Sequence, residues 1–405
     1  MATLQMATLQ TATLKDLRQQ CKDRGFKGCS GLKKADLIKL IATKSSSALR
    51  EPDFVLQPMI TYIGNKRKLV PWIMEIIQEI GTNLKVLDGF AGSGVVSRAL
   101  MSNCSELHSN DMEYYSYILL RCFLETPTLE QIGRIDKHFD TISKIPADTG
   151  YIAKLYSPEN TAEPLDGERC FYTRENAVII DTLMKYIEGV EPDIKHYLMG
   201  PLLIKASINV NTAGVFRGFY KKDGIGHFGG AGENALERIL APIQIEKPIW
   251  SKSACKSVCY QSDINELILT FDNQFDVIYL DPPYNEHPYG SNYFMLNLIA
   301  NGQEPVDCSK VSGIPKLWNK SAFNGRNSAF DAMVLLLTNC LQKARYVLIS
   351  YNNEGLITDW ATIFQTLQCN VKKYEKEYDT YHGSRNLNGR NMKVVEIMYL
   401  LSKKN

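Results

Sequence analysis

Short apolar runs separated by helical stretches constrain the fold of this chain more than any other feature. Each run has the length of one buried strand, and two of them lead directly into turns rich in glycine or proline. Strands that alternate with helices in this way form a parallel sheet with helices packed on its faces. The pattern therefore predicts an α/β fold, with strands at 85–88, 276–281, 344–350 and 393–400 and a weaker strand at 107–109.

One long region lacks this alternation of strands and helices and divides the chain. Residues 120–250 contain helical stretches and a glycine-rich segment, 215–230, in which basic and aromatic residues alternate. We interpret this region as an inserted domain. The main domain would then comprise residues 51–119 and 251–405, preceded by a separate segment of residues 1–50.

The first 50 residues are strongly basic. They carry ten Lys or Arg and three Asp, and the remaining chain has 36 basic and 41 acidic residues. A basic arm on a nearly neutral body is typical of an electrostatic anchor to phosphate, although a charged run alone is also typical of a solubilising tail. A helix from Leu14, a glycine turn at 26–31 and a second helix with Lys33 and Lys34 resemble the SAP module, a small DNA-binding unit. A generic helical hairpin is the alternative.

Composition narrows the class of protein further. Hydrophobic residues make up 44% and charged residues 22% of the chain, which excludes wholesale disorder. No apolar run approaches the ~18–20 residues of a membrane span, so we expect no membrane partner. The scattered cysteines predict a reducing intracellular compartment. Cys255 and Cys259 lack a second pair of ligands nearby, so we expect no metal site.

The segment 86–94, Val-Leu-Asp-Gly-Phe-Ala-Gly-Ser-Gly, connects the end of a strand to a helical pattern at 95–101. Glycines let a ligand approach the backbone closely, and a helix N-terminus adds partial positive charge. No Gly-Lys-Ser/Thr closes the turn, which excludes a phosphate-binding loop of the Walker type. The carboxylate of Asp88 beside the turn suits a cationic ligand better than a phosphate. A purely structural turn is the alternative.

Asp111 lies in a second acidic motif, Asn110-Asp111-Met112-Glu113. An acid about 20 residues beyond a glycine turn can accept hydrogen bonds from a ribose diol. A lone acid at such a position is also commonly a helix N-cap. Together with the glycine turn, Asp111 indicates a nucleoside ligand without a pyrophosphate.

The third motif is Asp281-Pro282-Pro283-Tyr284, directly after an apolar strand. Two prolines fix the backbone and remove two donors, so the loop offers a carboxylate and carbonyls as acceptors. The ring of Tyr284 adds a flat surface. Acceptors beside a stacking surface suit a planar ring with an exocyclic amino group.

These motifs together resemble the amino-methyltransferases that use S-adenosylmethionine to methylate N6 of adenine in DNA. The segment 62–69, Tyr-Ile-Gly-Asn-Lys-Arg-Lys-Leu, is similar to the N-terminal cofactor motif of that family. The order of cofactor motif, glycine motif, insertion and Asp-Pro-Pro-Tyr is that of its alpha group, or D12 class, and the resemblance covers about residues 58–405. It implies a Rossmann-like class I methyltransferase sheet in which residues 120–250 are the target-recognition domain.

Three further segments, 110–117, 285–297 and 350–355, resemble a subgroup whose members often read CATG or related sites. The resemblance thus implies a CATG-like target in double-stranded DNA. It also implies a role in restriction–modification or in marking the cell's or virus's own DNA, with a cognate restriction endonuclease as a candidate partner.

The resemblance assigns roles to individual residues. Asp88 would lie near the amino-acid part of the cofactor, Lys66 near its carboxylate and Asp111 on its ribose. Asp263, in the segment 261–264, matches the site for the cofactor adenine or is an ordinary helix cap. The implied cofactor residues are Tyr62, Gly64, Lys66, Asp88, Phe90, Ala91, Gly92, Ser93, Gly94, Asp111 and Asp263.

For catalysis, Asp281 and the carbonyl of Pro282 would accept the two N–H protons of the adenine amino group. This favours a pyramidal N6 whose lone pair can attack the methyl group. Pro283 would hold the loop, and Tyr284 would stack on an adenine that has been flipped out of the duplex. A covalent cytosine mechanism is excluded, because no Pro-Cys pair presents a cysteine nucleophile.

Two basic segments are candidates for DNA contact. Arg217, Lys221 and Lys222 lie in the glycine-rich segment of the insertion, and Arg385 and Arg390 lie in a loop at 381–391. Each segment is also compatible with a solvated surface loop. Tyr289 and Tyr293, which follow Asp-Pro-Pro-Tyr, would either close over the flipped base or pack in the core.

Other functions share these motifs. Similar Pro-Pro-aromatic loops serve RNA adenine, cytosine N4 and protein amides, and a catalytically silent DNA-binding protein would keep the same fold. The aspartate before the prolines and the basic arm favour DNA adenine. The intact glycine motif and Asp281 favour an enzyme over a silent binder.

Overall fold

The computed structural model describes residues 57–230, 232–272, 274–379 and 393–404, together with the isolated positions 13, 14, 33, 34, 37, 54 and 55. The chain divides into two compact units, Met1–Val55 and Leu56–Asn405. In the first unit Lys33 and Lys34 are exposed and Leu37 is buried. Most of the predicted SAP-like module lies outside the described residues.

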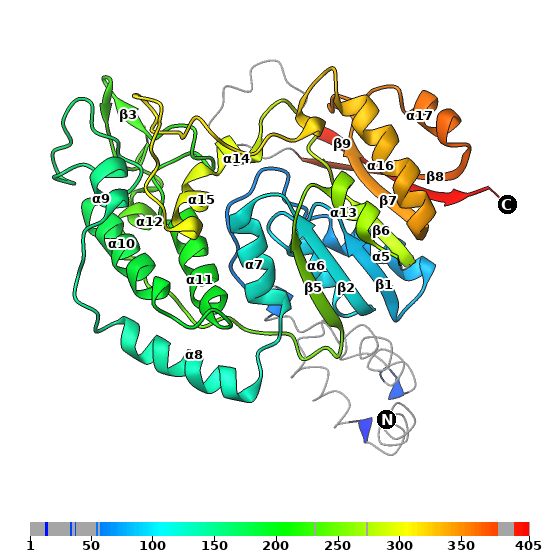
Figure 1. Cartoon of the computed structure of the whole chain (residues 1–405), viewed down its shortest axis with the longest axis horizontal. Helices are drawn as coiled ribbons and strands as arrows, with labels where there is room; N and C mark the ends of the chain where they lie inside the picture. The colour runs from blue at the N-terminus through cyan, green and yellow to red at the C-terminus, as the bar shows by residue number, and fades with distance from the viewer. Residues whose placement is uncertain are drawn as a thin grey trace. The chain divides into compact units, whose positions relative to one another are not determined.

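A seven-stranded sheet forms the centre of the second unit (Figure 1). Its order is β5 (Lys256–Gln261), β2 (Cys104–Asp111), β1 (Leu84–Asp88), β6 (Phe275–Leu280), β7 (Ala344–Asn352), β9 (Lys393–Lys403) and β8 (Cys369–Asp379). The first five strands are parallel, as the sequence pattern predicts. β9 is antiparallel to both of its neighbours, which the sequence analysis does not anticipate. The α/β fold is confirmed, with a mixed rather than a fully parallel sheet.

Helices cover both faces of this sheet. On one face, α16 (Ala329–Lys343) packs against β7, α13 (Ile264–Thr270) and α17 (Trp360–Leu367). Leu87, Ile278 and Val347 from three adjacent strands share a buried core with this group of helices. On the other face, α6 (Val95–Leu100) and α7 (Tyr114–Leu124) pack against β2, and α5 (Val70–Ile80) packs against α6. No helix in the described part of the chain is both long and apolar enough to cross a membrane.

A second group of helices lies between α7 and β5 in the sequence and to one side of the sheet in Figure 1. It contains α8 (Leu129–Ile142), α9 (Tyr151–Tyr156), α10 (Arg174–Glu188), α11 (Lys195–Ile208), α12 (Leu236–Leu240) and the hairpin of β3 (Lys221–Lys222) and β4 (Ile225–Gly226). The expected start of the insertion at residue 120 falls inside α7. α7 packs against β2 and β5 of the sheet and also against α11, so the expected boundary falls inside a helix that contacts both groups.

Two short helices after β6 connect these regions. α14 (Tyr289–Asn292) leads into α15 (Phe294–Asn301), and α15 packs against α7, α10 and α11. The residues that follow the Asp-Pro-Pro-Tyr motif are therefore held by both the sheet and the inserted helices.

Candidate active site

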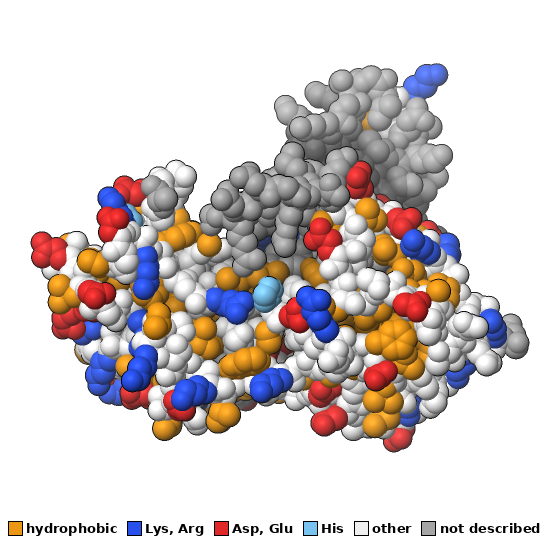
Figure 2. Space-filling model, turned by 90° about the horizontal axis from the view of Figure 1, so that it is seen from above, with side chains coloured by type: hydrophobic (Ala, Val, Ile, Leu, Met, Phe, Trp, Pro, Cys, Tyr) orange, Lys and Arg blue, Asp and Glu red, His pale blue; other side chains and the backbone are white. Residues whose placement is uncertain are grey.

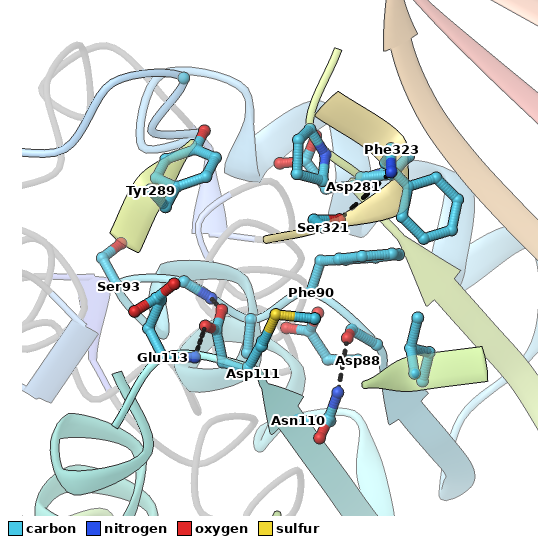
Figure 3. A pocket seen from close by; sticks show the side chains of 18 of the residues that line it. Asp88, Phe90, Ser93, Asn110, Asp111, Glu113, Asp281, Tyr289, Ser321 and Phe323 are labelled. Carbon is cyan, nitrogen blue, oxygen red and sulfur yellow. Dashed lines mark hydrogen bonds between the residues drawn. The ribbon is translucent and has the colours of Figure 1, made fainter. Parts of the chain in front are cut away.

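One pocket opens where the parallel strands β1, β2 and β6 end, and it encloses about 920 Å³ when its open mouth is included. Ligands of open α/β sheets bind at the carboxyl ends of the strands. The predicted catalytic and cofactor residues line this pocket, and Gly94 lies just behind it as the N-cap of α6. Figure 3 shows Asp88 and Asp281 on opposite sides of Phe90.

The glycine turn is packed against the ring of Tyr62. Gly92 and Gly94 have left-handed backbones, with φ of 52° and 76°. A Cβ on Gly92 would lie 2.9 Å from the Tyr62 ring, so a side chain there would displace the tyrosine. Glycine is required at this position both for its conformation and for this close approach.

Asp88 ends β1 and is fully buried. Its Oδ2 accepts a hydrogen bond of 2.6 Å from the hydroxyl of Ser97. Its Oδ1 is enclosed and forms no hydrogen bond of normal geometry with the described residues. Burial raises the pKa of this carboxyl to about 7, although the Ser97 hydroxyl acts in the opposite direction. The enclosed oxygen is an acceptor suited to a donor on a cationic ligand.

Asp111 organises the loop at the end of β2. Its Oδ2 accepts from the backbone N–H of Gly92 at 2.8 Å, and its Oδ1 accepts from that of Glu113 at 2.9 Å. Because α7 begins after Glu113, Asp111 is not the N-cap of that helix. Burial raises the pKa of Asp111 to about 6.

Glu113 is a pocket residue that the sequence analysis does not single out. Its side chain is buried and accepts a hydrogen bond of 2.6 Å from Asn297 of α15. Burial raises its pKa to about 7. The position could have been suspected only from its place in the acidic motif beside Asp111.

The structure shows Asp263 as a helix cap, and its contact with the cofactor adenine stays a prediction. It is the N-cap of α13, where its side chain accepts from the backbone N–H of Asn265 at 2.8 Å. It also lines the pocket.

Asp281 forms a buried ion pair. Its Oδ1 lies 2.8 Å from Nζ of Lys66, and the same ammonium lies 3.2 Å from Oε1 of Glu396 on β9. Lys66 thus contacts two carboxylates, whereas the resemblance implied a place near the carboxylate of the cofactor. Burial acts to lower the pKa of Lys66, but Asp281 and Glu396 together hold it well above its usual value. Glu396 is fully buried and was not found from the sequence, because a lone glutamate in an apolar strand belongs to no motif.

Tyr284 lies beside this ion pair. The Nζ of Lys66 is 5.5 Å from the centre of its ring, and the backbone carbonyl of Tyr284 accepts from the N–H of Leu356 at 3.0 Å. Gly64 has a φ of 74°, and a Cβ there would lie 2.8 Å from the Tyr284 hydroxyl. The 62–69 segment is therefore packed directly against the Asp-Pro-Pro-Tyr loop.

Tyr289 and Tyr293 have different surroundings. The ring of Tyr62 stacks on both, with ring centres 4.9 Å apart in each pair, and the centres of the Tyr289 and Tyr293 rings are 6.0 Å apart. Tyr293 is fully buried, and its hydroxyl accepts from the N–H of Ile63 at 2.7 Å. Tyr293 therefore packs in the core, whereas Tyr289 lines the pocket.

A segment far from the motifs completes the wall of the pocket. Residues 302–328, which we call the strap, connect α15 to α16. Near the middle of the strap, the carbonyl of Gly313 accepts from the hydroxyl of Tyr156 in α9 at 2.7 Å. Near its end, Asn324 donates to the carbonyl of Asn285 at 2.7 Å. Asn319, Ser321, Phe323 and Asn324 line the pocket. No motif marks these residues in the sequence.

The predicted DNA-contact residues in the insertion are exposed. Lys221 and Lys222 form β3 of the hairpin, and Arg217 lies 3.2 Å from His287 in the loop after Tyr284. Figure 2 shows Lys and Arg side chains beside a histidine in the middle of one face of the molecule. Arg385 and Arg390 lie outside the described residues.

The comparisons with known proteins agree with this geometry. The model of the D12 class N6 adenine-specific DNA methyltransferase family matches residues 62–322. The type II methyltransferase M.NlaIII of Neisseria lactamica is 30% identical over 309 residues, which are 74% of this chain and 85% of that protein. M.CviAII of Paramecium bursaria Chlorella virus 1 is 31% identical over 307 residues, with the same shares. The modification methylase StsI of Streptococcus sanguinis is 24% identical over 369 residues, which are 85% of this chain and 52% of StsI.

The family model begins at the Tyr62 motif and ends in the strap, so it spans the pocket, the insertion and the Asp-Pro-Pro-Tyr loop. Of the acceptors that the sequence left open, this assignment selects adenine N6 in DNA over RNA, cytosine and protein amides. The chain belongs to the D12 class of N6 adenine-specific DNA methyltransferases and is an enzyme of the restriction–modification type.

Proposed function

We propose that this pocket transfers a methyl group from S-adenosylmethionine to N6 of an adenine flipped out of duplex DNA. The observation that carries the proposal is that the Asp281 loop and the glycine turn open into one pocket at the ends of adjacent strands. A donor bound at the glycine turn and a base bound at Asp281 would share this space.

The residues of the pocket fit the proposed cofactor. Asp88 has an enclosed oxygen without a hydrogen bond of normal geometry to the described residues, which suits the amino group of a methionine moiety. Asp111 retains lone pairs for ribose hydroxyls beyond its two backbone donors. Asp263 and Phe90 line the pocket near the glycine turn and would hold the adenine ring. When bound, the cofactor supplies an electrophilic methyl group.

At the other end, Asp281 and the carbonyl of Pro282 would accept the amino protons of the target adenine. The Oδ1 of Asp281 is enclosed and paired with Lys66, and its side chain is 16% exposed in the pocket that it lines. We assign the other oxygen, Oδ2, to the adenine amino group. Pro283 keeps the loop rigid, and Tyr284 offers its ring for stacking.

We assign the helices between α7 and β5 to target recognition and the exposed Arg217, Lys221 and Lys222 to DNA contact. The SAP-like arm with Lys33 and Lys34 would add a second phosphate contact, and Arg385 and Arg390 a third. Neutralising Lys221 and Lys222 together should reduce the slope of log K against log salt by about 2 units, since each phosphate contact contributes about 0.9. Deletion of residues 1–50 should lower the slope in the same way. Equal slopes for all three proteins would contradict these assignments.

A CATG-like site is the proposed target, on the resemblance of the segments 110–117, 285–297 and 350–355. Sequencing of methylated plasmid DNA would locate the modified adenine. Plasmid methylated by the enzyme should then resist a restriction endonuclease that cuts the same site. Methylation scattered over unrelated sequences would contradict a single target site.

The activity is tested by methyl transfer from labelled S-adenosylmethionine to unmethylated genomic DNA, with modified nucleosides identified by mass spectrometry. Wild-type enzyme should produce N6-methyladenine, and Asp281→Ala should produce none. Asp272→Ala is the matched control, because Asp272 is exposed near the opposite end of β6. If Asp281→Ala retained the activity of Asp272→Ala, the assignment of Asp281 would be wrong.

A further inference from the structure

We propose that Glu396 is a positioning residue that keeps the catalytic cluster negatively charged by offsetting Lys66. The proposal rests on the proposed role of Asp281 as the acceptor for the adenine amino group. It assigns a function to a residue of β9 that lies about 115 positions from the Asp-Pro-Pro-Tyr motif.

The geometry places three charges together in a buried site. The ammonium of Lys66 lies 2.8 Å from Asp281 and 3.2 Å from Glu396, and the side chains of Lys66 and Glu396 are 4% and 0% exposed. The hydroxyl of Ser350 on β7 donates to Oε1 of Glu396 at 2.5 Å and fixes its orientation. Water screens the pair of Lys66 and Glu396 only weakly because both side chains are enclosed, whereas Asp281 is 16% exposed where it borders the pocket.

The reaction requires a net negative charge at this point. As the N6 lone pair forms the new N–C bond, the electrons of the S–C bond go to sulfur, and positive charge passes to N6. One N6 proton then leaves to solvent, which restores a neutral base. A carboxylate beside N6 stabilises this developing charge.

Lys66 would cancel the charge of Asp281 if the two residues were alone, because an adjacent cation and anion sum to zero. Glu396 adds a second negative charge in contact with the same ammonium, so the three groups carry a net charge of −1. Lys66 can then hold Oδ1 of Asp281 in place without removing the negative potential that the developing cation needs.

Other titratable groups surround Asp281. Lys66 and Glu396 act on its charge, and the neighbours on which its charge acts in turn are Asp88, Tyr279, Tyr284 and Tyr289. Burial raises the pKa of Asp281, Lys66 lowers it and Glu396 raises it. Removing the charge of Glu396 should therefore shift the pKa of Asp281 downward.

The first test is Glu396→Gln, which keeps the shape of the side chain and its ability to accept from Lys66 and Ser350. We expect kcat for methyl transfer to fall about 10- to 100-fold, the order expected when one enclosed charge is removed near the reacting nitrogen. The KM for DNA and the Kd for S-adenosylmethionine should stay close to wild type. The acid limb of the kcat–pH profile should move to lower pH, which a loss of structure alone would not cause. A wild-type kcat would overturn the proposal.

The second test is the double variant Lys66→Met with Glu396→Gln. It removes one positive and one negative charge and returns the cluster to −1, so its loss of kcat should be smaller than the product of the losses in Lys66→Met and Glu396→Gln measured separately. Two independent structural defects would instead multiply. A loss in the double variant equal to or greater than that product would therefore overturn the charge-offset proposal. All three variants are checked for folding by their thermal transitions.

Ser350→Ala is the matched control. It removes the hydrogen bond to Glu396 but no charge, and we expect kcat to fall less than about threefold, because every charge of the cluster stays in place and Lys66 still contacts Glu396. A loss as large as that of Glu396→Gln would assign Glu396 a purely geometric role and overturn the proposal. Failure of the proposed function itself would look different: wild-type enzyme would make no N6-methyladenine, or Asp281→Ala would remain active.

Discussion

Asp88 and Asp281 occupy equivalent places on neighbouring strands but have opposite surroundings. Asp88 ends β1, Asp281 follows β6 directly, and the two strands are paired in parallel. Asp88 is fully buried beside a neutral hydroxyl, whereas Asp281 is held by the ammonium of Lys66. The carboxylate without an internal cation suits a cationic ligand, and the carboxylate with one suits a neutral donor such as an amino group. The same residue type thus serves two kinds of ligand through the charge of its neighbour.

The largest effect should come from Asp281→Asn. This variant keeps the size of the side chain but replaces an acceptor oxygen with a donor nitrogen and removes the charge. We expect single-turnover methyl transfer to slow by at least about 10²- to 10³-fold, with the Kd for S-adenosylmethionine within a few-fold of wild type. A large loss of cofactor affinity would show that the two aspartates do not divide the pocket as we propose.

Asp88→Asn should have the complementary effect. Loss of a charged hydrogen bond of about 1.5–3 kcal/mol predicts S-adenosylmethionine binding that is weaker by about 10- to 100-fold in calorimetry. At saturating cofactor, the rate of methyl transfer should stay within a few-fold of wild type. Equal affinity for wild type and variant would remove Asp88 from the cofactor site.

The pH dependence of cofactor binding tests the contrast between Asp88 and Asp281 without a change of sequence, and its expected effect is smaller. Burial raises the pKa of Asp88 to about 7, so the carboxyl is mostly protonated at pH 6 and mostly ionised at pH 8. Because a cationic ligand prefers the carboxylate, affinity should rise about tenfold from pH 6 to pH 8. The Asp88→Asn protein should show no such rise, and a rise of equal size in that variant would assign the titration to another group.

The smallest effect should come from Ser97→Ala. Its hydroxyl donates to Asp88 at 2.6 Å and lowers the pKa of that carboxyl, so its loss should raise the pKa further. Affinity for S-adenosylmethionine at pH 7 should fall about 2- to 10-fold. The deficit should shrink above pH 8, where Asp88 is ionised in both proteins. A deficit that is constant with pH would indicate a packing defect instead.

The parts of the fold that were predicted have strong local patterns. β1, β6 and β7 each contain a run of buried apolar residues because helices cover both faces of the sheet, and such runs are recognisable in sequence. β5 and β8 are the edge strands of the sheet and were missed. β5 is half exposed, and β8 contains Lys-Lys-Tyr-Glu-Lys-Glu, so neither has the apolar run of a buried strand.

The site was predicted where its residues follow one another in the chain and missed where they do not. The three motifs, together with the segments 62–69 and 261–264, contain most of the pocket lining. Glu396 of β9 contacts Lys66 only because β9 lies beside β7 in the sheet, and strand order is not encoded in any local pattern. The same holds for the strap, whose Asn319 reaches Glu113 from more than 200 positions away.

The place of β9 in the sheet has a consequence for synthesis on the ribosome. β9 follows β8 in the chain but lies between β7 and β8, and it pairs with both. A nascent chain that ends at β8 leaves β7 as an open edge and gives β8 no adjacent strand. Such a chain also lacks Glu396, the glutamate of β9 that contacts Lys66. Truncated chains should therefore be both prone to aggregation and unable to modify DNA, so that only chains that extend through β9 mark the genome.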